Sequence, residues 1–379
     1  MSIGQKHITV LVSNDLQFDQ RVAKVCESLK TMNYQVLLVG RMMPGSQPFE
    51  RPYATKRFNL WFQKGAFFYA ALNIRLFFFL LFKKTDVILA NDLDTLLPAF
   101  LISRLKNIDV VYDSHEYFTE AEGLTGRMFQ KRVWLGIERF IFPKLKHVYT
   151  VNESIAQIYR DLYHVDVKVV RNIPKLQSGI QPKSRHDLGL PEHQKIIILQ
   201  GAYIDPDRGG EELIQSMQYM QGVLLLIIGS GRAMDTLKKM VVELNLVDKV
   251  RIMGKMPFGE LRQFTMAADL GLSLDKPLHL NYTLSLPNKL FDYLHAGIPV
   301  LVSDLPELRR IVSNYGVGVI ASSYDPKILA DDIHRALYHE DYSQWKKNCL
   351  LAREELNWEN EAKVLQVIYG NLLIRLIST

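Results

Sequence analysis

Residues 284–304 read LSLPNKLFDYLHAGIPVLVSD, in which one helical pattern leads directly into one apolar strand pattern. Pro287 suits the first turn of a helix, Ser285 is a candidate N-cap, and Gly297 suits the position just past the helix end. The apolar run over 299–303 then predicts a strand. A helix that feeds straight into a strand is typical of parallel α/β sheets.

Lys289 lies in the first turn of this predicted helix. A lysine there meets the positive end of the helix dipole, which is unfavourable unless an anion is bound nearby. Helix N-termini bind phosphate through their free backbone N–H groups. The lysine therefore predicts a phosphate-containing ligand at this turn.

The same alternation of apolar runs and helical patterns extends along all 379 residues. It predicts two doubly wound domains, each with a parallel sheet built from βαβ units. Between them, residues 172–191 contain three prolines and no apolar periodicity, which is typical of a linker. The predicted strands are 7–13, 35–40, 86–90, 110–112, 147–151 and 167–170 in the first half, and 195–200, 223–228, 249–253, 270–274, 299–303 and 318–320 in the second.

Composition narrows the function classes. The 46 Lys and Arg against 40 Asp and Glu give a net charge of +6, which is too small and too dispersed to indicate nucleic-acid binding. An anionic ligand or membrane surface would suit this charge. Cys26 and Cys349 lie far apart in the sequence, which indicates a reducing compartment and excludes a disulfide framework. The N-terminus enters a strand without the layout of a signal peptide, so we expect a cytoplasmic protein.

Residues 65–82, GAFFYAALNIRLFFFLLF, form an apolar helical stretch followed by two lysines. Asn73 and Arg75 interrupt a run that is already short for a membrane span of about 20 residues. We therefore expect either a buried helix of the first domain or a helix lying in a membrane interface. A second basic and aromatic stretch over 127–146 favours contact with an anionic membrane surface without excluding the core interpretation.

Ligands of parallel sheets gather at the carboxyl ends of the strands. After strand 195–200, Arg208 precedes two glycines and a helix start, where a guanidinium can grip phosphate oxygens; a solvated loop arginine is the alternative. After strand 223–228, the glycines of GSG suggest a dinucleotide fingerprint. Met234 stands where that fingerprint needs Gly or Ala, so we interpret these glycines as a tight turn.

Strand 110–112 is followed by Asp113, Ser114, His115 and Glu116. Such a cluster can orient a sugar hydroxyl or move a proton, although a lone histidine is often structural. The nearby pair Asp92 and Asp94 has the spacing of a DxD metal motif. Capping of a helix N-terminus by one of the two explains the pair more simply, so we expect no metal there.

These features together resemble the retaining glycosyltransferases of family 4, the glycosyl transferases group 1. That family has the GT-B fold, in which two Rossmann-like doubly wound domains face each other across a cleft. The resemblance covers nearly the whole chain and is most specific in LPNKLFDYLHAGIPV. It rests on DQRVAKVCESLKTMNYQVLLVGR (19–41), DSHE (113–116), KVVRNIP (168–174), DRGGEELI (207–214), IIGSGR (227–232), LPNKLFDYLHAGIPVLVSDLPELRRIV (286–312) and NWENEAKVL (357–365).

The resemblance implies an acceptor-binding domain over 1–172, a linker over 173–191 and a nucleotide-sugar-binding domain over 192–357. It also implies a helix over 358–379 that packs back on the first domain.

The resemblance also implies roles for individual residues. Arg208 and Lys289 would neutralise the leaving diphosphate, and His115 would lie beside the transferred sugar. Asp292 would hold the ribose hydroxyls, with a shorter side chain than the family's usual Glu. The other implied donor-binding positions are Gly201, Gly209, Gly254, Lys255, Leu286, Pro287 and Asn288, of which Gly254 and Lys255 would lie near the base.

Three positions depart from the family pattern. Leu284 stands where the first Glu of a spaced pair is usual, and Ala202 or Tyr203 where an Arg is usual. The first loop, 13–15, lacks glycines. These departures concern sugar recognition and leave both proposed cations in place.

The expected reaction moves a sugar from a nucleotide-sugar donor to a hydroxyl of a glycan or lipid-linked acceptor, in cell-surface polysaccharide synthesis at the inner face of the membrane. Two cations and a helix N-terminus would stabilise the charge that grows on the leaving oxygen. Following the resemblance, we expect retention by front-face attack, without a metal or other cofactor. The alternatives are a nucleotide-sugar epimerase, a nicotinamide dehydrogenase and a non-catalytic nucleotide-sugar-binding protein.

Overall fold

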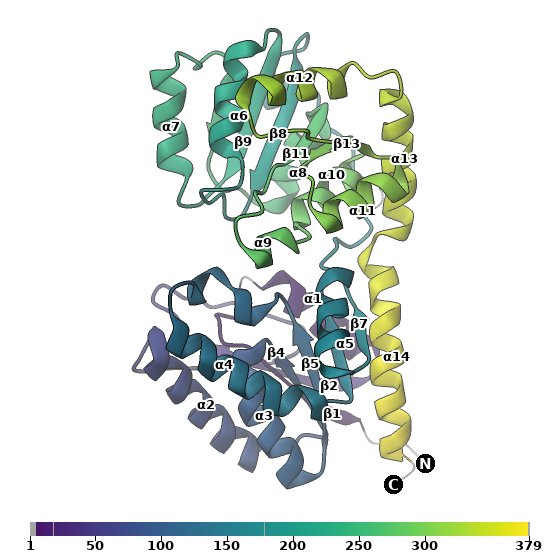
Figure 1. The fold of residues 1–379 in the computed structure, drawn as a ribbon. Coiled ribbons are helices and arrows are strands. Elements are labelled where there is room, and N and C mark those ends of the chain that lie inside the picture. Colours follow the sequence, from purple (N-terminus) through teal and green to yellow (C-terminus); the bar gives the residue numbers. More distant parts are fainter. Residues whose placement is uncertain (1–4, 18, 178, 378–379) are drawn as a thin grey trace. The chain divides into compact units, whose positions relative to one another are not determined.

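The computed structural model describes residues 5–17, 19–177 and 179–377, which form two compact units (Figure 1). Unit 1 consists of the chain up to Asn172 together with the segment from Trp358 onward, and unit 2 is Ile173–Asn357. The C-terminal segment therefore belongs to the same unit as the N-terminal half of the chain.

Unit 1 is a parallel sheet with helices. Its strands are β1 (Lys6–Leu11), β2 (Tyr34–Arg41), β3 (Ala54–Phe58), β4 (Val87–Asn91), β5 (Asp109–Ser114), β6 (His147–Thr150) and β7 (Val167–Val169). Its α-helices are α1 (Gln20–Thr31), α2 (Gly65–Phe82), α3 (Leu93–Lys106), α4 (Met128–Ile141), α5 (Glu153–Tyr163) and α14 (Trp358–Ile377). The strand order is β3-β2-β1-β4-β5-β6-β7, and the pairings are parallel.

Unit 2 repeats this architecture. Its strands are β8 (Lys195–Gly201), β9 (Val223–Gly229), β10 (Val250–Met253), β11 (Leu270–Ser273), β12 (Val300–Val302) and β13 (Gly318–Ile320), in the order β10-β9-β8-β11-β12-β13. Its α-helices are α6 (Gly210–Ser216), α7 (Met234–Glu243), α8 (Phe258–Ala267), α9 (Leu280–Thr283), α10 (Asn288–Ala296), α11 (Pro306–Tyr315), α12 (Pro326–Leu337) and α13 (Tyr342–Glu355).

Strand β8 shows why the sheet of unit 2 is covered on both faces. Successive side chains of a strand point to opposite faces. Ile197 and Leu199 pack in one core with α6, α7 and α12, whereas Ile196 and Ile198 pack in another with α8, α10, α11 and α13. An apolar run without alternation therefore encodes a strand buried on both faces.

Helix α14 completes the core of unit 1. Trp358 donates from its indole nitrogen to the Ser28 hydroxyl at 3.0 Å, and the Tyr34 hydroxyl donates to the carbonyl of Tyr369 at 2.9 Å. Leu365 and Leu372 join the same apolar cluster as β1 and α1. Helix α14 therefore packs on β1, β2 and α1 within unit 1.

Each strand predicted from the sequence has a counterpart within the described residues, but β3 was missed. Its residues, ATKRF, have no apolar alternation because this is an edge strand with mostly exposed side chains.

The predicted N-cap at Ser285 is wrong. Helix α10 begins at Asn288 with Pro287 in the cap position, and the Ser285 hydroxyl donates to the carbonyl of Tyr282 at 2.8 Å. The short preceding helix α9 engages this serine. The predicted end at Gly297 is confirmed, because this glycine has the left-handed φ of 73° that closes a helix.

Helix α2 is neither a core helix nor fully exposed. Its buried side chains are Phe68, Leu72, Leu76 and Leu80, a single stripe at a spacing of four residues. It is long and apolar enough to cross a membrane, and 22% of this stretch is buried. The expectation of a buried core helix is therefore wrong for most of its surface.

Candidate active site

The sheet of unit 2 changes direction of winding between β8 and β11, which are neighbours in the sheet but not in the sequence. The loops that follow two such strands diverge and leave a crevice at their carboxyl ends, the usual ligand position in an open α/β sheet. Arg208 follows β8 and Asp275 follows β11. The topology thus brings together two residues that are 67 positions apart.

Asp275 is fully buried and holds two cations. One carboxylate oxygen accepts a hydrogen bond from Arg208 at 2.6 Å, and the other lies 3.4 Å from the Lys289 ammonium and accepts from Ser273 at 3.2 Å. Burial raises the pKa of the Asp275 carboxyl, but Lys289 and Arg208 outweigh burial and hold that pKa below its ordinary value. Asp275 is therefore ionised at neutral pH.

Arg208 is positioned by the turn between β8 and α6. The next residue, Gly209, has a φ of 76°, and a Cβ atom there would lie 2.5 Å from the carbonyl oxygen of Leu274. Only glycine fits this approach. The guanidinium carbon of Arg208 lies 4.3 Å from the ring centroid of Tyr282, and its Nε atom is buried without a hydrogen-bond partner among the described residues. Arg208 thus retains hydrogen-bonding capacity for a ligand.

Lys289 lies in the first turn of α10, next to the exposed Asn288. Its side chain is only 12% exposed. Burial lowers the pKa of Lys289, Asp275 opposes this shift, and Arg208 adds to it. Two cations and one carboxylate leave a net charge of +1 beside a helix N-terminus, which favours an anion.

Asp292 follows Lys289 by three residues on α10 and accepts a hydrogen bond from the Gln200 amide at 3.2 Å. Gln200 is fixed in turn by the Thr265 hydroxyl at 2.7 Å. Asp292 also lines a hollow of about 10 Å³ together with His295, which is room for about one water molecule.

The remaining predicted donor-site residues lie at strand ends of unit 2 or directly before α10. Gly201 ends β8, while Gly254 and Lys255 follow the edge strand β10 and are exposed. Leu286 and Pro287 precede α10 and are partly buried. Gly229 ends β9 with a φ of 153°, where a Cβ atom would lie 1.9 Å from the carbonyl of Gly201, in keeping with the predicted tight turn.

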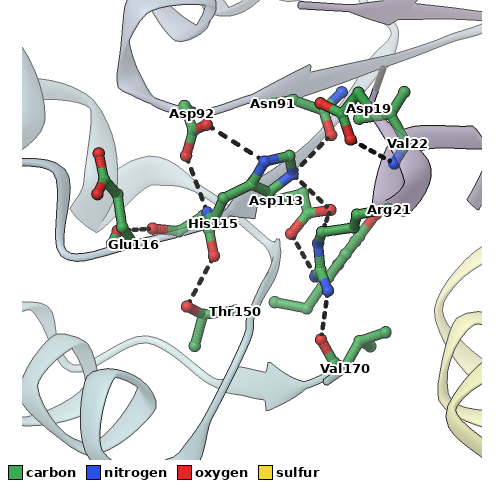
Figure 2. A network of polar contacts seen from close by, with 12 residues as sticks. Asp19, Arg21, Val22, Asn91, Asp92, Asp113, His115, Glu116, Thr150 and Val170 are labelled. Carbon is green, nitrogen blue, oxygen red and sulfur yellow. Dashed lines mark hydrogen bonds and ion pairs between the residues drawn. The ribbon is translucent and has the colours of Figure 1, made fainter. Parts of the chain in front are cut away.

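Unit 1 holds a second polar cluster, centred on His115 at the end of β5 (Figure 2). Its ring Nδ1 lies 3.3 Å from Asp92, and its Nε2 lies 3.3 Å from Asp113 and 3.2 Å from the side-chain oxygen of Asn91. Burial lowers the pKa of His115, but the two carboxylates outweigh burial and raise that pKa to about 9. The imidazole is therefore positively charged at neutral pH and acts as a donor rather than as a base.

Asp113 links His115 to Arg21 on α1. The Arg21 guanidinium binds Asp113 through two hydrogen bonds of 3.1 and 2.7 Å and donates a third to the carbonyl of Val170 at 2.7 Å. Arg21 and Asp113 are both buried. Two cations and two carboxylates make a charge-balanced network (Figure 2).

The expectation that Asp92 or Asp94 caps a helix is wrong for both side chains. Asp92 occupies the cap position of α3 but makes no capping bond; it accepts from the His115 backbone N–H at 2.8 Å instead. Asp92 has φ 59° and ψ 164°, a region that glycine alone adopts without strain. Asp94 is buried, with one carboxylate oxygen unpartnered among the described residues and a pKa that burial raises to about 7.

Sequence reasoning missed Asp275, Tyr282, Asn91 and Arg21. Asp275 carried a usable signal, because it directly follows the predicted strand 270–274. Across residues 5–17, 19–177 and 179–377, no group of three or more His, Cys, Asp or Glu side chains could hold a metal ion.

Comparison with known proteins relates both units to one enzyme class. The family model described as Glycosyl transferases group 1 matches residues 180–349, and Glycosyltransferase Family 4 matches residues 20–175. A curated relative, an uncharacterized glycosyltransferase of Methanocaldococcus jannaschii, is 24% identical over 245 residues. That match spans 59% of each chain.

Solved structures with the same fold cover almost the whole chain. Sucrose-phosphate synthase from Thermosynechococcus elongatus has a TM-score of 0.78 at 18% identity, over 98% of this chain and 100% of that one. Anabaena HepE in complex with UDP and glucose has a TM-score of 0.70 at 15% identity, over 97% and 100%. WaaG, a glycosyltransferase involved in lipopolysaccharide biosynthesis, has a TM-score of 0.72 at 15% identity, over 96% and 100%. The predicted GT-B fold is confirmed.

Proposed function

Because the chain belongs to the glycosyl transferases group 1, we propose that it transfers a sugar from a nucleotide-sugar donor to a hydroxyl of a glycan or lipid-linked acceptor, with retention of anomeric configuration. The observation that carries this proposal is the buried Asp275 with Arg208 and Lys289 on its two carboxylate oxygens. This arrangement fixes two cations at the sheet position where α/β proteins bind nucleotides.

The two cations act on the leaving group. Breaking the bond between the sugar and the diphosphate leaves negative charge on the departing phosphate oxygen. The Nε–H group of Arg208 and the ammonium of Lys289 stabilise that charge more in the transition state than in the bound donor. Asp275 keeps both side chains oriented before the donor arrives, so little reorganisation is needed during the reaction. This charge balance supports transfer that is independent of a divalent metal.

Retention is proposed by front-face attack, in which the acceptor oxygen enters on the side from which the diphosphate departs. Double displacement would instead need a free carboxylate as nucleophile. The acid next to the two cations, Asp275, is fully buried and held by both of them, so it is poorly suited to that role.

The other donor contacts are proposed residue by residue. Backbone groups from Leu286 to Asn288 meet the diphosphate, Asp292 binds the ribose hydroxyls, and the segment at Gly254 and Lys255 lies near the base. Charged His115 of unit 1 contacts the transferred sugar, while Asp92 and Asp113 keep it protonated. Uridine diphosphate is the first nucleotide to test, because it is bound in the similar Anabaena structure.

The acceptor is proposed to lie at the inner face of the cell membrane, in cell-surface polysaccharide synthesis. The support is helix α2, which exposes Phe67, Phe78 and Phe82 beside its buried stripe. A protein of similar fold takes part in lipopolysaccharide biosynthesis.

Product analysis tests the proposed reaction. Purified protein is incubated with a panel of nucleotide sugars and membrane extract, with and without a metal chelator. We expect release of nucleoside diphosphate that requires an acceptor, survives chelation and gives a product with the donor's anomeric configuration by NMR. Conversion of the donor sugar without acceptor would establish an epimerase instead, and loss of turnover on chelation would refute the metal-independent mechanism.

A further inference from the structure

An open hollow of about 360 Å³ lies between the edge strand β3 and helix α2 of unit 1. Three cations line it, namely Lys56, Arg75 and Lys83. The other lining residues are phenylalanines: Phe58, Phe78, Phe79 and Phe82. We refer to these seven residues as the basic aromatic hollow. It lies outside the donor site, which belongs to unit 2.

The three cations of the hollow have no carboxylate partner within ion-pair distance among the described residues. They pack on aromatic rings instead. The Lys56 ammonium lies 4.9 Å from the ring centroid of Phe79, and the Arg75 guanidinium lies 5.4 Å from that of Phe58. Such contacts orient the cations but do not neutralise them. Three like charges around one hollow therefore favour an anion in it.

The apolar part of the hollow continues onto the outer surface of α2. Phe58 is buried beneath it, whereas Phe82 is 83% exposed. Further along the helix, Phe67 and Ile74 are also exposed, although a water-facing helix normally carries polar residues there. A hydrophilic anion would leave this surface uncovered. The surface fits a ligand that is anionic at one end and apolar at the other.

We propose that the basic aromatic hollow binds the phosphate headgroup of an anionic membrane lipid, with the acyl chains against Phe78 and Phe82. Arg75 supplies a planar fork that suits phosphate oxygens, and Lys56 and Lys83 supply further donors. This proposal rests only on the part of the proposed function that places the enzyme at a membrane. It names the lipid group that would hold unit 1 at the membrane surface where the acceptor would lie.

Vesicle flotation measures the binding. Wild type is compared on phosphatidylglycerol-containing and pure phosphatidylcholine vesicles with the triple variant Lys56→Gln, Arg75→Gln and Lys83→Gln. The matched control removes three exposed cations of unit 2, by Lys239→Gln, Lys346→Gln and Lys347→Gln, and so has the same net charge. At roughly 1 kcal/mol for each basic residue near an anionic surface, we expect the hollow variant to lose on the order of 100-fold in partitioning, and the control little. Equal losses of vesicle partitioning in both variants would overturn the proposed lipid site in the hollow.

A soluble lipid separates a headgroup site from a site for free phosphate. Dihexanoyl phosphatidic acid should bind wild type with one site by calorimetry and should not bind the hollow variant. Inorganic phosphate should bind far more weakly, because it cannot cover the phenylalanines. Phosphate binding as tight as that of the lipid would overturn the proposal, as would displacement of the lipid by an oligonucleotide.

The exposed variant Phe82→Ser gives a second test. It should weaken binding of the short-chain lipid while thermal unfolding stays unchanged, and an unchanged lipid affinity would contradict the acyl-chain contact. Nucleoside diphosphate binding to unit 2 reports separately on the proposed enzymatic function, so failure of either hypothesis can be told from failure of the other.

Discussion

Asp275 is the residue that sets the electrostatics of the proposed donor site. Its two oxygens bind two cations that would otherwise repel each other, and the carboxylate itself is out of contact with solvent. A pair with one partner removed is costly when the remaining charge is buried. Lys289, which is nearly buried, is the group that would be left without its counter-charge.

We predict that Asp275→Asn lowers the free energy of unfolding by about 3 kcal/mol, because it leaves two cations without a carboxylate. Thermal unfolding measures this change. The control is Asp304→Asn, which breaks the exposed pair with Arg309 and should change the stability far less, because solvent screens exposed ion pairs. Similar shifts in melting temperature for both variants would mean that Asp275 does not stabilise the fold through its two cations.

His115 provides a pH-dependent prediction. Its pKa of about 9 lies above the ordinary value of 6.5, so the stability that its ion pairs contribute is fully present below pH 6.5 and is lost as the pH rises through about 9. An NMR titration, assigned with His115→Gln, should give a pKa near 9 in wild type. Asp92→Asn should lower this pKa towards the ordinary value. A wild-type His115 that titrates near pH 6.5 would be mostly neutral at neutral pH, which would contradict the positive charge that we assign to it.

Among the elements of the proposed donor site, the turn between β8 and α6 leaves no room for a side chain at Gly209. Gly209 has a left-handed backbone, and its Cα lies so close to Leu274 that a Cβ atom would be 2.5 Å from the Leu274 carbonyl oxygen. This close approach sets the direction of the neighbouring Arg208. The turn therefore couples the packing at the ends of β8 and β11 to the position of Arg208.

We predict that Gly209→Ala destabilises the protein by at least about 2 kcal/mol, because it adds a steric clash to backbone strain. The control is Gly222→Ala. Gly222 also has a positive φ, but a Cβ atom there would meet nothing within 4 Å, so this variant should cost only about 1 kcal/mol. Chemical denaturation compares the two. Equal losses of stability in the two variants would show that the close approach of residue 209 to Leu274 adds no clash.

The elements that the sequence predicts well are those specified by local pattern. Strands such as β8 and β9 read as unbroken apolar runs, and Gly297 marks the end of α10 because only glycine suits a left-handed cap. The start of α10 was misplaced because Ser285 donates to the carbonyl of Tyr282 in the preceding helix α9 instead of capping α10. Helix and capping propensities do not predict this hydrogen bond between Ser285 and Tyr282.

At the scale of the whole molecule, the chain repeats one architecture, and each unit contains one of the two polar clusters described above. In each unit the cluster lies at the carboxyl ends of a parallel sheet, near the strands where the winding reverses. The sequence predicted both positions and several members of the clusters, namely Arg208 and Lys289 in unit 2 and Asp113 and His115 in unit 1. Asp275 and Arg21 were missed because Asp275 is 67 residues from Arg208 and Arg21 is 92 residues from Asp113, and periodicity carries no information about such distant pairs.

Arg208 and Lys289 are proposed to bind the diphosphate of a nucleotide-sugar donor, and calorimetric titration with nucleoside diphosphates measures this binding. Wild type should bind one of UDP, GDP, ADP or CDP, and Arg208→Ala and Lys289→Ala should each weaken that binding by at least about 10-fold, since a hydrogen bond to a charged group contributes roughly 1.5–3 kcal/mol. The control Arg309→Ala, at an exposed ion pair, should bind like wild type. Unchanged nucleotide affinity in both folded variants would show that Arg208 and Lys289 do not bind the diphosphate.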